Sequence, residues 1–184
     1  MPAAVIASLW AMPLCQHTIY GIPYEIRPLT RADRDRLAAA FGRMSERSRL
    51  LRFLGPKPKL SGAELTYLTD IDHVTHEALA AVDPDDGTIV GVARYAQDRD
   101  APGTADVAFF VVDAWQGQGI GTALGRQLME RADANGIGRL TATTFADNRA
   151  ARAVVRKLGF VTVGIGAGVV DLVRVRHAAT ASHP

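Results

Sequence analysis

Short apolar blocks, several of them with alternating polar positions, predict the strands of this chain. Blocks rich in β-branched, aromatic and small apolar residues are typical of strands that are partly or fully buried. The segment Pro84-Asp85-Asp86-Gly87 separates two such blocks and supplies the residues that tight turns need, so these two blocks should pair as a hairpin. The predicted strands are residues 24–29, 77–83, 88–98, 105–113 and 139–145, with two more within 161–175.

Helices are predicted where apolar residues recur every three or four positions. The clearest case runs from Ile120 to Ala134, and the pair Asn135-Gly136 follows it as a stop signal. Ser61 and Glu64 have the spacing of an N-terminal capping box for an earlier helix. Further helices are expected after Thr30 and Asp33 through Phe41, over 45–53, and over 147–157 before Gly159.

Together these elements predict one α/β (α+β) domain with a mixed, largely antiparallel central sheet and flanking helices. A chain of 184 residues with 48% apolar positions can bury roughly 70% of its unfolded surface, which suits one domain. We expect an N-terminal arm over residues 1–23, the domain over 24–176 and a flexible tail over 177–184.

Charge and cysteine content narrow the functional classes. The net charge of +2 is spread evenly along the chain, whereas a nucleic-acid surface needs clustered lysine and arginine. The single cysteine, Cys15, excludes an internal disulfide and a cysteine metal cage. We therefore expect a cytoplasmic protein that binds no nucleic acid.

The opening segment, residues 1–26, is apolar enough to be tested as a targeting segment. It has no lysine or arginine before Arg27, and Pro13 interrupts it, so neither a signal peptide nor a membrane helix is expected. We expect it to pack on the domain, without a membrane partner. The alternative is that this apolar arm forms a homodimer contact.

The stretch DAWQGQGIGTAL, residues 113–124, has glycine at three alternate positions between a predicted strand and a predicted helix. Glycines there let backbone N–H groups approach a ligand, and the helix N-terminus favours an anion such as pyrophosphate. The Lys-Ser/Thr pair of a P-loop is absent, and the spacing differs from the dinucleotide fingerprint. A tight turn without a ligand is the alternative.

Two motifs in this order resemble the GNAT superfamily of N-acetyltransferases. Gln116, Gly119 and Gly121 match its acetyl-CoA loop, and FADNRAARAVVRKLGF, residues 145–160, resembles its second motif, with Asn148 opening the helix. The likeness spans Ile26 to Val175. It implies acetyl-CoA as the acetyl donor and transfer of the acetyl group to an amine.

The segments before the sheet resemble one branch of this superfamily. Residues 27–55 and 68–79 are similar to the acetyltransferase domains of bacterial protein-lysine acetyltransferases. Small stand-alone relatives of the superfamily include antibiotic acetyltransferases. The resemblance therefore leaves the acceptor amine open.

The resemblance also implies how the donor is held. The strand ending at Val111 should splay from the strand beginning near Leu140, with Val111 N–H as oxyanion donor and the loop N–H groups on the pyrophosphate. The implied cofactor-binding residues are Val111, Val112, Asp113, Gln116, Gly117, Gln118, Gly119, Ile120, Gly121, Thr122, Asn148 and Arg152.

Asp106 is our first candidate for the general base. It lies on the same alternate face of its strand as Ala108 and Phe110, and family members often carry an acid near this place. The alternative is an ordinary carboxylate at a strand end. The runner-up group is Asp72, His73 and His76, in which no third ligand has metal spacing, so no metal is expected; packing roles are the alternative for these histidines.

One position departs from the family pattern. Many members carry a tyrosine that protonates the leaving thiolate, and here that position is Val155. Either the thiolate leaves unaided, or Tyr95 or Tyr67 takes this role.

The aspartates of the central segment favour a cationic acceptor, because carboxylates near the reacting nitrogen would hold its other charges. We expect a small amine such as an aminoglycoside. A protein lysine side chain is the alternative acceptor, and a non-catalytic acetyl-CoA sensor is the alternative of another class. The expected acceptor-binding residues are Asp72, His73, His76, Tyr95 and Asp100.

Overall fold

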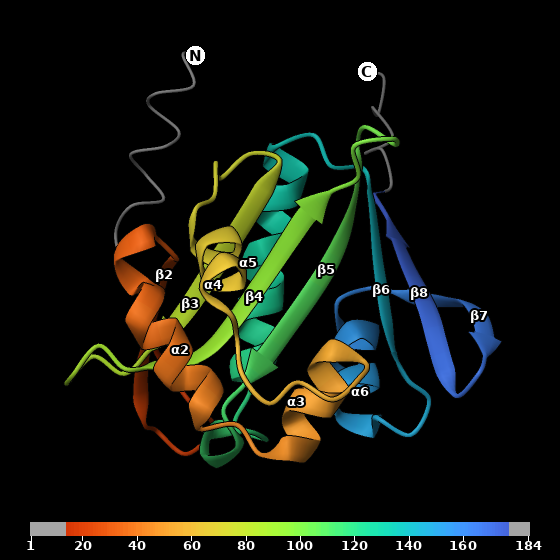
Figure 1. The fold of residues 1–184 in the computed structure, drawn as a ribbon. Coiled ribbons are helices and arrows are strands. Elements are labelled where there is room, and N and C mark those ends of the chain that lie inside the picture. The colour runs from red at the N-terminus through yellow and green to blue at the C-terminus, as the bar shows by residue number, and fades with distance from the viewer. Residues whose placement is uncertain (1–13, 177–184) are drawn as a thin grey trace, which may run out of the picture.

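One mixed eight-stranded sheet forms the centre of the protein, in the order β1-β2-β3-β4-β5-β6-β8-β7 (Figure 1). The computed structural model describes residues 14–176. Neighbouring strands pair antiparallel except β5 and β6, which run parallel. The strands are β1 (Leu14–His17), β2 (Pro23–Pro28), β3 (His76–Val82), β4 (Ile89–Gln97), β5 (Thr104–Val111), β6 (Arg139–Phe145), β7 (Val161–Gly166) and β8 (Val169–Val175).

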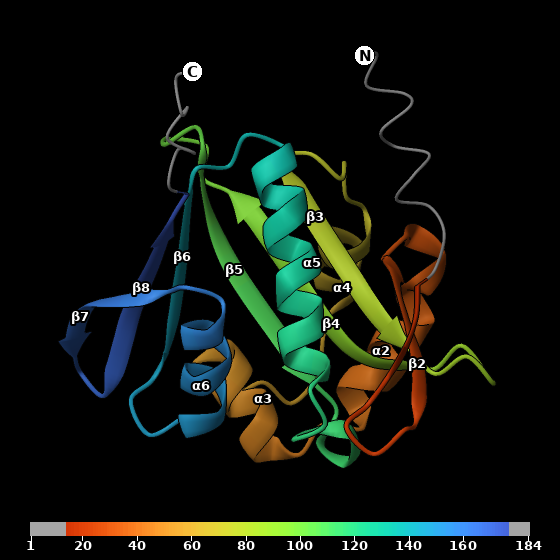
Figure 2. The same cartoon turned by 180° about the vertical axis from the view of Figure 1, so that it is seen from behind.

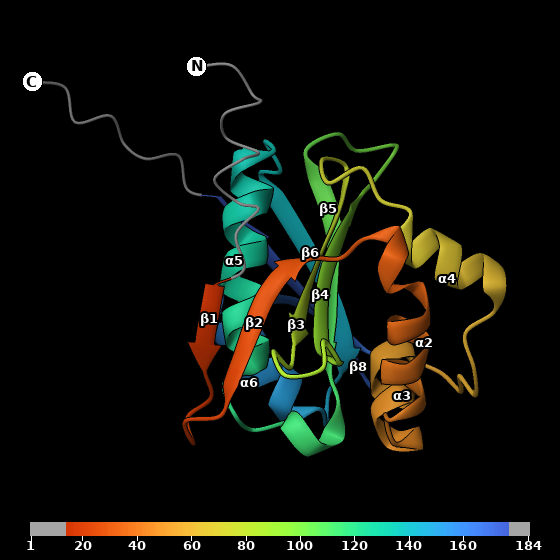
Figure 3. The ribbon, with the colours of Figure 1, turned by 90° about the vertical axis from the view of Figure 1, so that its left-hand side faces the viewer.

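The helices form two layers, one on each face of the sheet (Figures 2 and 3). α5 and α6 cover one face, and α2, α3 and α4 cover the other. Two short 3-10 turns, η1 (Arg31–Asp33) and η2 (Asp113–Trp115), lead into the helical segments. The helices are α2 (Arg34–Gly42), α3 (Glu46–Phe53), α4 (Gly62–Thr69), α5 (Ile120–Ala134) and α6 (Arg149–Lys157).

The core is divided by the sheet into two apolar clusters. The larger one lies under α5 and α6, where Leu124 and Leu128 of α5 are fully buried. Burial of such a leucine side chain contributes about 1.5–3 kcal/mol, which anchors α5 firmly on the strands. The smaller cluster lies under α2 and α4 and includes Leu37 and Val92. Strands β3 and β4 are buried on both faces as a result.

Strands β5 and β6 separate soon after they begin to pair. Only three positions are in register, Thr104 with Arg139, Ala105 with Leu140 and Asp106 with Thr141. Beyond this last rung, which we call the fork, β6 turns away with β8 and β7 (Figure 1). The splayed strand pair predicted from the sequence is thereby confirmed. We call the space between the two strands beyond the fork the strand opening; α6 lies on one side of it and α3 on the other (Figures 1 and 2).

The predicted mixed α/β fold is confirmed, and the capping box of Ser61 and Glu64 is present as expected. β1 was not predicted: residues 14–17 lie within the expected arm and pair with β2 at the edge of the sheet. The first part of that arm, residues 1–13, and the expected tail, residues 177–184, lie outside the described residues. Within the described range, no helix is both long enough and apolar enough to cross a membrane.

Candidate functional site

The register of β4 and β5 turns alternate backbone groups of β5 toward the strand opening. Val112 N–H donates to Val90 O at 2.9 Å and Asp98 N–H to Thr104 O at 2.8 Å, so the even-numbered residues of β5 bond with β4. The N–H groups of Phe109 and Val111 consequently point away from β4, to the side that β6 has left. This orientation fits the oxyanion donor expected at Val111.

The loop between β5 and α5 has the conformation of an anion-binding nest. Gly117 and Gly119 have φ angles of 74° and 92°, which are favourable only for glycine, and Gly119 caps α5 without any side-chain bond. A Cβ on Gly117 would meet no atom within 4 Å, so the backbone is open to a ligand. The first-turn N–H groups of α5, beginning at Ile120, add the positive end of a helix dipole. This loop fits a pyrophosphate.

Two other segments brace this loop. Ile19, in the turn between β1 and β2, donates its N–H to Gln118 O at 3.3 Å. On the other side, Gln116 Nε2 donates to Val111 O at 2.9 Å. Asp113 accepts bonds from Ser45 N–H at 2.9 Å and Ser45 Oγ at 2.6 Å, which fastens the start of α3 to the loop. The Asp113 carboxylate is therefore committed to α3, and only its backbone is left for a donor molecule.

At the start of α6, the side chains expected to meet the cofactor also have local partners. Asn148 Oδ1 accepts from Ala151 N–H at 3.1 Å and caps the helix. Arg152 Nη1 donates to Ala146 O at 3.0 Å, while the residue is exposed. Gly121 lies close to both β5 and α6, since a Cβ there would meet Val111 Cγ2 at 3.7 Å. Thr122 follows in the first turn of α5, where its N–H bonds Gly119 O at 3.0 Å.

A polar row crosses the sheet at the fork. His76 is in register with Ala96, Ala96 with Asp106, and Asp106 with Thr141. Directly paired residues share a face, so these side chains lie on the α3 and α4 side of the sheet. Thr141 Oγ1 donates to Asp106 Oδ1 at 3.3 Å. The structure thus brings the first candidate base and one residue of the runner-up group to the same face.

Asp106 has the electrostatic environment of a usable base. Protein atoms packed around its carboxyl raise its pKa above the ordinary value of 3.8, although one side of the residue stays in solvent. The Thr141 hydrogen bond and the positive charges of Arg52 and Arg94 act in the opposite direction. A carboxylate with a raised pKa that still contacts solvent can accept a proton from an amine near neutral pH.

Sequence reasoning missed two arginines on this face. Arg94 is 7% exposed and lies in the middle of β4, opposite Ala108 of β5. Arg52 reaches the same region from α3, and both arginines line a recess between the sheet and the helices of this face. The sequence did carry one signal, the arginine at position 94 inside an otherwise apolar strand. Arginine is rarely buried unless its charge is paired, so its presence there indicates a partner.

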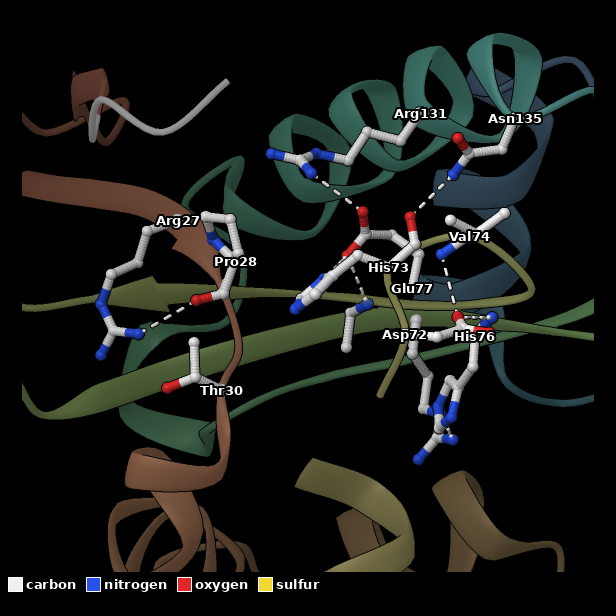
Figure 4. Close-up of polar contacts among 12 residues, drawn as sticks. Arg27, Pro28, Thr30, Asp72, His73, Val74, His76, Glu77, Arg131 and Asn135 are labelled. Atoms are coloured by element: carbon white, nitrogen blue, oxygen red, sulfur yellow. Dashed lines mark hydrogen bonds and ion pairs between the residues drawn. The ribbon is translucent and has the colours of Figure 1, made fainter. Parts of the chain in front are cut away.

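The loop before β3 uses Asp72 and His73 for its own structure (Figure 4). Asp72 accepts from Val74 N–H at 2.9 Å and His76 N–H at 2.8 Å, and bonds to this loop lower its pKa to about 2 against the effect of burial. His73 Nδ1 lies 2.7 Å from Glu77 Oε1, a buried carboxylate that also accepts from Arg131 at 2.9 Å. These groups hold the loop against β3 and α5.

Tyr95 and Asp100 are not brought to the fork. Tyr95 is fully buried on the α5 face, where its hydroxyl donates to Val74 O at 2.8 Å and accepts from Asn135 Nδ2 at 2.7 Å. Asp100 is an exposed residue of the loop between β4 and β5, which lies at the end of the sheet away from α3 (Figure 1). Neither position supports the acceptor contact expected from the sequence.

Val155, at the usual tyrosine position, is buried in the larger core cluster. Tyr95 is committed as just described, and the ring of Tyr67 lies over the Arg94 guanidinium at 5.0 Å. Among the described residues, no group of three or more histidine, cysteine or acidic side chains could hold a metal ion.

A mixed sheet whose parallel strands separate, with an anion-binding loop at the start of a helix, fits an acyltransferase that takes its acyl group from acyl-coenzyme A. The profile of the acetyltransferase (GNAT) family matches residues 48–160, and the chain belongs to that family. It is an acetyl-CoA-dependent N-acetyltransferase.

Three known proteins show the range of the likeness. The chain is 37% identical over 138 residues to acetyltransferase PA5475 of Pseudomonas aeruginosa, covering 74% of each chain. It is 31% identical to acetyltransferase Pat of Mycolicibacterium smegmatis over 80% of this chain and 44% of that protein. The crystal structure of the GNAT domain of S. lividans PAT has a TM-score of 0.82 and 28% identity, with 96% of this chain and 99% of that one covered.

Proposed function

We propose that the protein acetylates the ε-amine of a lysine side chain in a protein, with Asp106 as the general base. The observation that carries this proposal is the position of Asp106: its carboxyl lies at the fork, with a raised pKa, next to the backbone of β5 that faces the strand opening. Similarity to Pat and to the PAT domain of S. lividans supports the lysine acceptor.

The donor is acetyl-CoA, which supplies an activated thioester carbonyl. The nest of Gly117 and Gly119 and the first turn of α5 would hold its pyrophosphate by backbone N–H groups. Val111 N–H would donate to the carbonyl oxygen as negative charge develops on it. Gln116 keeps the end of β5 in place by bonding the Val111 carbonyl.

Asp106 would take the proton that the acceptor nitrogen loses as the new N–C bond forms. Thr141 holds one carboxylate oxygen, which leaves the other to face the amine. Without a tyrosine at position 155, we propose that the thiolate leaves without a protein acid, because a thiol with a pKa near 8.5 is already a good leaving group.

The charges around the fork favour a lysine over a polycation. Asp70 is paired with Arg31 at 2.5 Å, and Asp72 is bonded to its own loop, so these acids are not directed at the fork. The charged neighbours of Asp106 are instead Arg52 and Arg94. An aminoglycoside carries several ammonium groups and would be repelled there, whereas a single lysine brings one.

The test is a panel of amines with acetyl-CoA, in which release of free CoA and the mass of the acceptor are both followed. Lysine peptides and a folded protein should each gain about 42 Da for every acetyl group, because acetylation replaces one hydrogen of the amine with an acetyl group. Turnover on aminoglycosides alone would replace the lysine acceptor with the small cationic amine. Binding of acetyl-CoA with no turnover on any amine would favour the sensor.

A further inference from the structure

A recess lies between the sheet and the layer of α2, α3 and α4, close to the fork. It has a volume of about 20 Å³, and its walls are apolar except for two guanidinium groups, those of Arg52 and Arg94. Ala108 and Phe110 of β5 form part of its floor. These two residues share the face of β5 that carries Asp106, so the recess adjoins the proposed base.

Arg94 is buried with part of its hydrogen-bonding capacity unused. Its Nη2 contacts His76 Nε2, and the ring of Tyr67 lies 5.0 Å from its guanidinium carbon. Its Nη1 is buried and has no hydrogen-bond partner among residues 14–176. An unpaired buried donor on a charged group costs free energy, so it is informative when a structure retains one.

Arg52, in the opposite wall of the recess, also has a buried nitrogen without a hydrogen-bond partner among the described residues, its Nε. Burial, and secondarily the charge of Arg94, lower the pKa of Arg52 to about 10, so it is still cationic at neutral pH. Within residues 14–176, Asp106 is the one carboxylate whose charge acts on both arginines, and it bonds Thr141 rather than either of them.

Two guanidinium charges thus share one carboxylate. Such an excess of positive charge in a poorly solvated recess is unfavourable unless an anion joins it. Guanidinium N–H groups form strong hydrogen bonds with the oxygens of a carboxylate or a phosphate, and a carboxylate is the smaller of the two anions.

We infer that the recess binds a carboxylate of the acceptor, a few bonds from the amine that Asp106 deprotonates. This inference rests on the proposed function and says which lysines the protein selects, namely those with a carboxylate close by. Ala108, opposite Arg94, is two residues from Asp106, so the backbone positions of the two groups lie about 7 Å apart along the sheet. A glutamate next to the acceptor lysine, or the α-carboxylate of lysine itself, can span such a distance.

The phosphates of the donor are a poor alternative occupant. The nest at Gly117 and Gly119 follows the far end of β5, beyond Val111, whereas Arg94 pairs with Ala108 nearer the fork. Arg94 also lines the recess on the face of α2, α3 and α4. The loop leads into α5, which covers the other face (Figure 3). The donor and the carboxylate therefore have separate cationic sites.

The experiment compares acceptors that differ in one carboxylate. Two peptides carry a single lysine followed by glutamate or by glutamine, and the second pair is free lysine and lysine amide. We expect kcat/KM to be at least about tenfold higher for the carboxylate member of one pair, which corresponds to about 1.4 kcal/mol. The pair that responds identifies the source of the carboxylate.

Arg52→Gln should reduce this preference to less than about threefold, mainly by raising KM for the carboxylate acceptor, while Arg52→Lys should keep part of it. Arg47→Gln is the matched control, because Arg47 is an exposed arginine of the same helix whose side chain points to Asp147. Acetyl-CoA binding by calorimetry verifies that each variant is folded. If Arg52→Gln fails to bind acetyl-CoA, the wild-type comparison of the paired acceptors alone decides.

The outcomes separate the inference from the proposed function. Equal kcat/KM within both pairs, or a preference that survives Arg52→Gln, would overturn the carboxylate site and leave lysine acetylation intact. Failure of every lysine acceptor to be acetylated would overturn the proposed function itself.

Discussion

Asp106 and Thr141 meet at the last rung where β5 and β6 are still paired, with Thr141 Oγ1 3.3 Å from Asp106 Oδ1. One step further along, the two strands have separated. The candidate base is therefore fixed by a partner on β6 at the very point where the strand opening begins. A base in this position is held by the sheet itself rather than by a loop.

Asp106→Asn should lower kcat by roughly 10²-fold or more, with acetyl-CoA affinity nearly unchanged, because the amide keeps the shape but cannot accept a proton. Burial raises the pKa of Asp106. As the pH is lowered, the kcat/KM of the wild type should therefore begin to fall at a higher pH than the range in which an ordinary carboxylate titrates. Steady-state kinetics between pH 5 and 9 measures both effects. A wild-type rate in Asp106→Asn would move the role to His76, which shares the same face.

Gly119→Asp should weaken acetyl-CoA binding by at least about tenfold, because it places a carboxylate against the proposed pyrophosphate and has to adopt a φ of 92°. Gly136→Asp is the control: this glycine also has a positive φ, of 76°, but follows the other end of α5. Calorimetry with acetyl-CoA compares the two variants. Equal affinity in both would remove the nest from the donor site.

The stability of the fold should decrease in mild acid because of His76. Burial, followed by the charge of Arg94, lowers the pKa of His76 from 6.5 to about 4, so the unfolded chain takes up this proton more readily than the folded one. Stability from this group is complete above pH 6.5 and is lost as the pH falls toward 4. At pH 5 the loss should be about 1–2 kcal/mol after allowance for solvent screening.

Urea unfolding at pH 7.5 and pH 5.0 measures this loss. His76→Gln should show a smaller difference between the two pH values, since glutamine does not titrate. A difference as large as that of the wild type would assign the acid sensitivity to other groups.

Gly125→Ala should destabilise the protein by about 1–3 kcal/mol, because its Cβ would lie 2.4 Å from Leu158 Cδ1 at the contact of α5 with α6. Gly42→Ala is the matched control, since that Cβ, at the end of α2, would meet no atom within 4 Å. Thermal unfolding should show a lower Tm only for Gly125→Ala; an unchanged Tm would mean that Leu158 repacks without cost.

The strand, the glycine loop and the helix of the proposed donor site could be predicted from the sequence because local chemistry determines them. Glycines at 117 and 119 adopt positive φ angles, and the apolar spacing from Ile120 onward produces the helix that follows them. Both signals lie within one continuous segment. The expected strand and helix therefore appear at their predicted places.

The proposed acceptor side could not be predicted in the same way, because tertiary packing brings its residues together. Arg52 and Arg94 come together only when α3 packs over β4, and no local pattern links them. Asp72 looked available for a substrate, but its loop neighbours Val74 and His76 occupy its oxygens with their N–H groups. Counting acids along the chain therefore suggested a cleft for cations where the folded protein has two guanidinium groups.

The bond from Ile19 N–H to Gln118 O has a consequence for how the chain responds to its donor. Ile19 belongs to the turn between β1 and β2, which lies outside the segment that matches the family profile, yet it braces the loop that would bind phosphate. A ligand that fixes that loop should protect the amides of the β1–β2 hairpin from hydrogen exchange. Loosening the hairpin should weaken binding of the ligand by the same free energy. Hydrogen exchange of the edge strand should therefore report how much of the protein has acetyl-CoA bound.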